Sequence, residues 1–154
     1  METMTLEQMY YIGEIIAAIA VIASLIYVGK QLRQNTSQMQ VNAATIYSQW
    51  ADDIYSRVAL DREFAEVWYK GKSNFDSLDE IDKQRILNFN MGVIYMWAHF
   101  FQMHQLKTLP DYFWKSQIWA YKNFGHRQDR QETWKILKES FDKPFQDFMS
   151  QYIE

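Results

Sequence analysis

The hydrophobic residues of this chain follow two different patterns. From Met9 to Gly29 nearly every residue is apolar, and Glu14 is the only charged side chain. A run of about 20 apolar residues matches the thickness of a bilayer core, so residues 9–29 are predicted to form a transmembrane helix. Further along the chain, apolar residues recur at helical spacing between polar ones, which is typical of helices that bury one face.

The start of the apolar segment favours a membrane anchor over two other interpretations. Thr5 and Gln8 have the spacing of a capping box, which predicts that a helix begins there. A cleaved signal peptide normally has a positively charged region before its apolar core, and this chain has none. A core helix of a soluble domain is also disfavoured, because a domain of this size rarely buries a helix that is apolar on every side.

Aromatic and basic residues flank the predicted span. Tyr10 and Tyr11 lie at one end and Tyr27 at the other, as in the aromatic belts of membrane proteins. Lys30 and Arg33 follow the span, and the residues before it are acidic. These five side chains are predicted to be membrane-interface anchors. By the positive-inside rule, the N-terminus lies outside and the bulk of the chain in the cytoplasm.

Small residues recur along one side of the predicted span. Gly13, Ala17, Ala20 and Ser24 are separated by four, three and four residues. Such a stripe lets helix backbones approach closely in lipid, and we interpret it as a helix-packing face. The alternative is that alanine is merely tolerated at these positions.

Glu14 is the one acidic residue inside the predicted span, and we expect it to be an intramembrane polar site. With residue 19 at the midpoint, it lies about 7–8 Å from the bilayer centre. A carboxylate at that depth is costly unless it is protonated, paired or hydrated, which suggests a ring in an oligomer, a bound cation or a partner subunit. Alternatively, the helix sits slightly higher and Glu14 reaches the headgroups.

The remainder of the chain is predicted to be helical, which gives an all-α fold. No proline or glycine interrupts the chain from Lys30 to Lys70, so the anchor is expected to continue as a long helix. The expected domains are an extracytoplasmic tail (1–8), a transmembrane helix (9–29), a helical extension (30–58) and a helical bundle (59–154). Within the bundle, the predicted helices are one capped by Asp61 and ending at Gly71, one opened by Ser77 with Glu80 and running to about Lys107, and others over Pro110–Phe124, Asp129–Phe141 and Pro144–Tyr152.

Composition excludes several classes of function and adds few candidates. The net charge is −3 with no basic stripe, so we expect no binding to nucleic acid. Cysteine is absent, and no motif for metal binding, phosphate binding or catalysis occurs, so we expect no enzyme activity, metal or cofactor. The middle of the longest bundle helix, Met91–Phe101, is predicted to be the core. Five aromatic residues either line a ligand pocket or, as we favour, pack that core: Trp97, Trp114, Trp119, Tyr121 and Trp134.

Three segments resemble a family of uncharacterised bacterial proteins. They are Met4–Thr36, Asp61–Gly71 (DREFAEVWYKG) and Met96–Phe101 (MWAHFF). Members of this family are short and have one N-terminal transmembrane helix followed by a helical cytoplasmic domain. The resemblance implies a protein of the bacterial inner membrane, and it supplies no catalytic residues.

These patterns lead to three hypotheses about function. The first is a membrane-anchored interaction protein that contacts lipid and either self-associates or acts as an accessory subunit of a membrane complex. The second is a homo-oligomeric pore or ion-handling channel with a ring of Glu14 side chains. The third is a small-ligand sensor or an enzyme whose site lies in the helical bundle.

Overall fold

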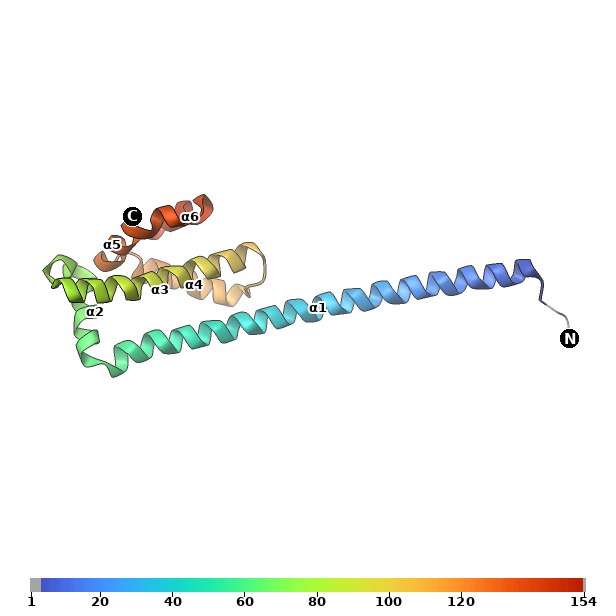
Figure 1. Cartoon of the computed structure of the whole chain (residues 1–154), viewed down its shortest axis with the longest axis horizontal. Coiled ribbons are helices and arrows are strands. Elements are labelled where there is room, and N and C mark those ends of the chain that lie inside the picture. The colour runs from blue at the N-terminus through green and yellow to red at the C-terminus, as the bar shows by residue number, and fades with distance from the viewer. Residues whose placement is uncertain (1–3, 154) are drawn as a thin grey trace. The chain divides into compact units, whose positions relative to one another are not determined.

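The described part of the chain is built from helices alone. The computed structural model describes residues 4–153, and these contain no strand. The elements are α1 (Leu6–Leu60), α2 (Arg62–Asn74), η1 (Phe75–Ser77), α3 (Glu80–Gln105), α4 (Asp111–Phe124), α5 (Gln128–Leu137), η2 (Lys138–Ser140) and α6 (Lys143–Ile153), where η marks a 3-10 helix. The predicted all-α fold class is therefore confirmed (Figure 1).

The chain divides into two compact units, and α1 contributes to both. The first unit comprises residues 1–41 and the second residues 42–154. We call their described parts the anchor segment (residues 4–41) and the helical domain (residues 42–153). The second half of the predicted 30–58 extension therefore belongs to the helical domain.

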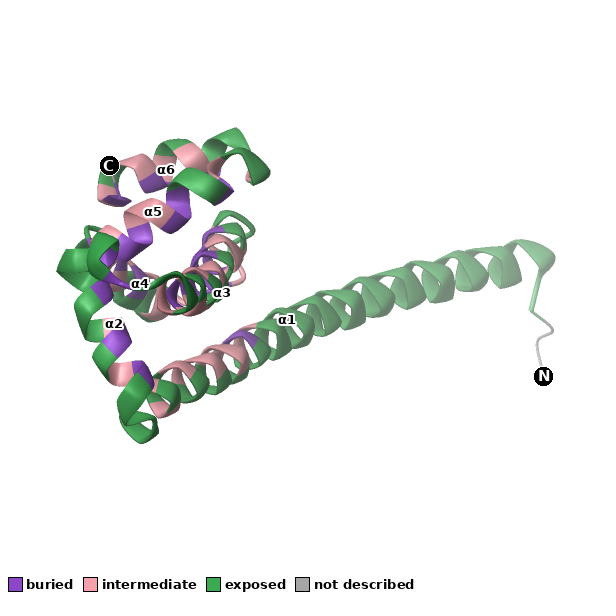
Figure 2. Cartoon of the chain, turned by 60° about the vertical axis from the view of Figure 1, so that its left-hand side comes forward, coloured by how far each residue is buried: buried purple, intermediate pink, exposed green. Residues whose placement is uncertain are grey.

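The anchor segment is a single exposed helix. Its start is the predicted capping box, in which the backbone N–H of Thr5 donates to Gln8 Oε1 (3.0 Å) and that of Gln8 donates to Thr5 Oγ1 (3.3 Å). Every residue from 4 to 39 is exposed, as the unbroken green of this segment in Figure 2 shows. Within residues 4–153, α1 is the one helix long and apolar enough to cross a membrane.

The helical domain is organised around α3. Its predicted core stretch, Met91–Phe101, contributes the buried residues Val93, Ile94, Met96, Trp97, Phe100 and Phe101. Tyr47 and Trp50, from the end of α1, pack edge-on against Phe100 with ring centroids 5.6 and 6.3 Å apart. Helices α2, α4 and α5 also pack on α3, and α6 packs on α4 and α5.

A smaller apolar cluster joins α2 to the start of α3. Its buried members are Phe64, Val67, Phe75, Leu78 and Ile86. Two glycines allow close packing elsewhere in the domain. A Cβ at Gly71 would lie 3.3 Å from Asp129 Oδ2, and one at Gly125 would overlap the backbone oxygen of Tyr152. Gly125 is therefore required by this close approach, whereas a Cβ at Gly71 would need its neighbours to shift by a few tenths of an ångström.

The helix boundaries confirm some of the predicted caps and correct others. Asp61 caps α2 as predicted, accepting from the backbone N–H of Phe64 at 2.9 Å. The predicted end of α2 at Gly71 is wrong, since this helix continues to Asn74. The predicted capping box of Ser77 with Glu80 is also wrong. Asp79 caps α3 instead, because its extended backbone (ψ 168°) places its carboxylate 2.8 Å from the N–H of Asp82.

Candidate functional site

The residues predicted to form a membrane site all lie along the anchor segment of α1. Gly13, Ala17, Ala20 and Ser24 are exposed, and a Cβ at Gly13 would meet no atom within 4 Å. The Ser24 hydroxyl donates to the carbonyl oxygen of Ala20 at 2.8 Å, so it is satisfied within its own helix. The packing face is thus smooth and has little polar character, which suits close contact between helices in lipid.

The other predicted membrane residues are exposed along the same segment. Glu14 is among them, and the rings of Tyr10 and Tyr11 lie edge-to-face at 5.9 Å. The Tyr27 hydroxyl accepts from Gln31 Nε2 at 3.2 Å, one turn further along. Lys30 and Arg33 follow directly. These side chains are spread along one helix, so the single chain does not gather them into a pocket.

The helical domain holds a buried ion pair that the sequence patterns did not predict. Arg127 and Asp129 have side chains that are 3% and 0% exposed. The guanidinium of Arg127 donates two hydrogen bonds to the carboxylate, from Nε to Oδ1 at 3.0 Å and from Nη2 to Oδ2 at 2.8 Å. Its Nη2 also donates to the carbonyl oxygen of Trp68 at 2.8 Å, and its Cζ lies 4.0 Å from the centre of the Trp68 ring. The pair therefore ties the start of α5 to α2.

A second buried guanidinium, that of Arg130, has no carboxylate partner among the described residues. It donates to Asn90 Oδ1 at 3.0 Å and to the carbonyl oxygen of Phe124 at 3.3 Å, and both acceptors are neutral. Its Cζ lies 4.7 Å from the centre of the Trp97 ring. Burial and, to a smaller extent, the nearby Arg127 charge lower the pKa of Arg130 to about 9, while the Asp129 charge acts in the opposite direction. At neutral pH the side chain remains cationic.

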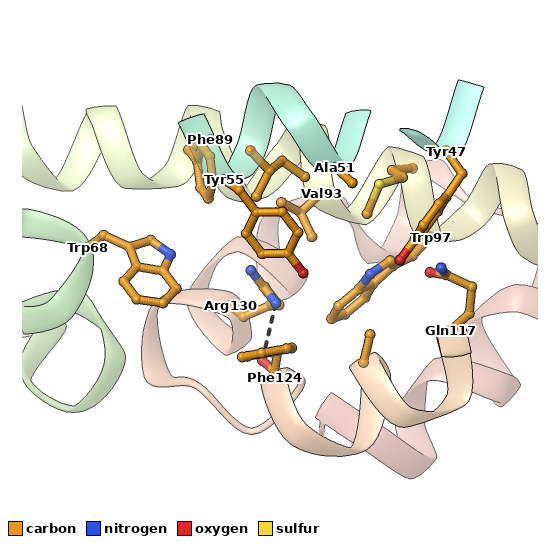
Figure 3. A pocket seen from close by; sticks show the side chains of 13 residues that line it. Tyr47, Ala51, Tyr55, Trp68, Phe89, Val93, Trp97, Gln117, Phe124 and Arg130 are labelled. Carbon is orange, nitrogen blue, oxygen red and sulfur yellow. Dashed lines mark hydrogen bonds between the residues drawn. The ribbon is translucent and has the colours of Figure 1, made fainter. Parts of the chain in front are cut away.

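Arg130 faces a cavity of about 100 Å³ inside the helical domain. Five helices contribute to its lining, and the labelled residues in Figure 3 show aromatic side chains around most of it. The lining consists of Tyr47, Ala51, Ile54 and Tyr55 from α1, Trp68 from α2, Phe89, Val93, Met96 and Trp97 from α3, Gln117, Ala120 and Phe124 from α4, and Arg130 from α5. Tyr55 is 65% exposed, so the cavity reaches the surface beside it.

Two residues that line the cavity each carry a buried polar atom without a hydrogen-bond partner among the residues described. They are Arg130 Nε, a donor, and Gln117 Oε1, an acceptor. Arg130 and Gln117 are 4% and 2% exposed. An unsatisfied buried polar atom costs about 1–3 kcal/mol, so two of them beside one cavity distinguish this position from an ordinary apolar core.

Four of the five predicted aromatic residues pack the core, and Trp114 is the partly buried one among them. Trp97, Tyr121 and Trp134 are buried, as expected for core packing, and Trp97 also lines the cavity. Trp119 is 59% exposed and belongs to neither. The sequence patterns missed Arg127, Asp129 and Arg130, because charges in a polar run normally indicate a solvated surface.

Within the described residues, no group of three or more His, Asp or Glu side chains is placed to hold a metal ion. Comparisons of the chain with models of protein families, with curated proteins and with solved structures give no match. Function is therefore inferred from two features of the chain: the exposed apolar helix of the anchor segment and the charged cavity of the helical domain.

Proposed function

We propose that this chain is a membrane-anchored interaction protein of the bacterial inner membrane. It crosses the bilayer once, and it self-associates or joins a larger membrane complex through its span. The observation that supports the anchor is that the apolar part of α1 contains no buried residue. A core helix of a soluble domain would be covered by its neighbours.

The cost of exposing the apolar side chains of the anchor segment to water also supports a position in lipid. Ile15, Ile19 and Leu25 are 60%, 61% and 67% exposed, and they represent a whole segment of similar residues. Burying one such side chain is worth roughly 1.5–3 kcal/mol. A helix of about 20 of these residues is stable in lipid, where its backbone polar groups are satisfied internally.

The orientation of the proposed protein follows from its flanking charges. Lys30 and Arg33 come directly after the span, whereas the residues before it are acidic. The excess of basic residues places the C-terminal side of the span in the cytoplasm. The helical domain, which follows on that side, is then cytoplasmic.

The stripe of small residues supplies the surface for association. Ala17→Leu combined with Ala20→Leu fills this face with bulk and is expected to weaken self-association, or association with the partner subunit, at least about tenfold. Crosslinking in native membranes, followed by size analysis of the products, measures this effect.

Ala18 provides a matched control, because it follows Ala17 in the sequence but lies on another face of the helix. Ala18 is about 130° away from the centre of the stripe at 3.6 residues per turn, so Ala18→Leu adds the same volume to a different face. It should leave the assembly unchanged. If the double variant assembles like the parent chain, or if the parent chain is a lone monomer in native membranes, the proposed association is wrong.

A further inference from the structure

The interior of the helical domain contains an uncompensated positive charge. Two guanidinium groups and one carboxylate are buried together: Arg127, Arg130 and Asp129. Both oxygens of Asp129 accept hydrogen bonds from Arg127, so the charge of this carboxylate is paired with that of Arg127. Arg130 is held by two neutral oxygens, and the described residues leave one positive charge unpaired beside the cavity.

A charge buried without a partner is costly, which makes its position informative. Removing a guanidinium from water costs several kcal/mol even after the protein relaxes, and contact with the face of Trp97 recovers only part of this. A bound anion would recover much more, since it pairs with the charge at close range. It would also offset the desolvation that lowers the pKa of Arg130.

The unpartnered atoms of the lining specify the polar groups of a ligand. Arg130 Nε–H is a free donor on the cation, and the acceptor that suits it best is an anionic oxygen. Gln117 Oε1 is a free acceptor on another residue of the lining, and its natural partner is a hydroxyl or N–H group. A ligand that carries both groups would satisfy both buried atoms.

The walls and volume of the cavity specify the rest of the ligand. Tyr47, Ile54, Phe89 and Trp97 give it a mostly apolar surface, which suits a hydrocarbon body and disfavours a strongly hydrated dianion such as phosphate. The volume of about 100 Å³ limits the body to a few carbon atoms. The exposed Tyr55 marks the side from which a small molecule enters.

We propose that this cavity binds a small organic monocarboxylate with a compact apolar body. Its carboxylate pairs with Arg130, and its own hydroxyl or N–H donates to Gln117. One negative charge on the ligand matches the one unpaired positive charge of the cavity. This binding site is a property of the helical domain, and it does not depend on how the anchor segment assembles.

The test uses the full chain in detergent micelles and calorimetric titration with four probes. The first probe is 2-hydroxy-3-methylbutanoate, which has the carboxylate, the hydroxyl and a branched apolar body. Its neutral amide lacks the charge, 3-methylbutanoate lacks the hydroxyl, and inorganic phosphate is an anion without an apolar body. We expect the hydroxy acid to bind at least about tenfold more tightly than its amide and than phosphate.

Variants locate the binding in the cavity. Arg130→Met should remove the preference for the acid over the amide, and Gln117→Met should remove the preference for the hydroxy acid over 3-methylbutanoate. Arg62→Met is the matched control, because the Arg62 side chain is 93% exposed and should not affect binding. If Arg130→Met does not fold, the Gln117→Met variant and the acid–amide comparison still decide the matter.

Three results would overturn the proposal. The first is that no probe binds at millimolar concentration. The second is that the amide or phosphate binds as tightly as the hydroxy acid. The third is that a folded Arg130→Met variant retains the preference for the acid.

Discussion

Arg127→Met is expected to lower the free energy of unfolding of the helical domain by about 3–5 kcal/mol, because it leaves the buried carboxylate of Asp129 without a partner. Asp129 is 0% exposed, and both of its oxygens depend on this one guanidinium. The variant also loses the bond to the Trp68 carbonyl oxygen and the contact with its ring. Urea unfolding of the full chain in mild detergent, followed by near-ultraviolet circular dichroism, measures the loss.

Two comparisons separate this cause from a general loss of arginine. Arg127→Met combined with Asp129→Asn removes the orphaned charge and should recover more than half of the lost stability. Arg57→Met breaks an ion pair with Asp53 whose side chains are 61% and 60% exposed, and it should cost no more than about 1 kcal/mol. If the free energy of unfolding falls by the same amount in all three variants, the buried ion pair is not what holds α5 in place.

Trp97→Ala is expected to cost about 3–5 kcal/mol, because it removes the largest side chain at the centre of the fold. Trp97 is 1% exposed and packs edge-on against Tyr121 at 4.9 Å, with Arg130 over its ring. The substitution opens a void next to the cavity and leaves the Arg130 charge without its aromatic face. The same unfolding experiment measures the effect.

Trp119→Ala is the matched control for this substitution. Trp119 lies on α4 and is 59% exposed, with one edge-to-face contact to Phe124 at 5.7 Å. Its removal should cost less than about 1 kcal/mol. Equal losses for the two tryptophans would contradict the assignment of α3 as the centre of the domain.

Features decided by neighbours in sequence were predictable. The Thr5–Gln8 capping box and the Asp61 cap each depend on residues three positions apart, and the structure contains both. The apolar stretch Met91–Phe101 also identified the core helix, because a helix that is apolar on most sides is covered by its neighbours at the centre of a bundle.

Features decided by tertiary packing were not predictable. Ser77 and Asp79 are both acceptable helix caps, and the structure uses Asp79 because Leu78 is extended and joins the smaller apolar cluster. The end of α2 was misplaced at Gly71 for a similar reason. Gly71 does not end the helix. It leaves room for the Asp129 side chain, because a Cβ at this position would lie 3.3 Å from Asp129 Oδ2.

The cavity was hidden from sequence patterns because its charges lie in a polar run. Arg127, Asp129 and Arg130 follow Gly125 closely and look like a solvated connection. The two arginines are buried because α2 and α3 supply the Trp68 carbonyl oxygen and the Asn90 amide from distant parts of the chain, and the end of α4 supplies the Phe124 carbonyl oxygen. Only the aromatic residues gave a signal, and among the five that were predicted Trp97 both packs the core and lines the cavity.

Cysteine labelling determines whether the anchor segment crosses a membrane. The chain has no cysteine, so Met4→Cys, Ala18→Cys and Gln105→Cys each introduce one thiol. A membrane-impermeant maleimide is applied to intact spheroplasts, to lysed ones and to lysates in denaturing detergent. If the anchor segment spans the membrane in the proposed orientation, Met4→Cys reacts on intact spheroplasts, Gln105→Cys only after lysis, and Ala18→Cys only in denaturing detergent. Labelling of Ala18→Cys as fast as Met4→Cys without detergent would contradict the membrane span.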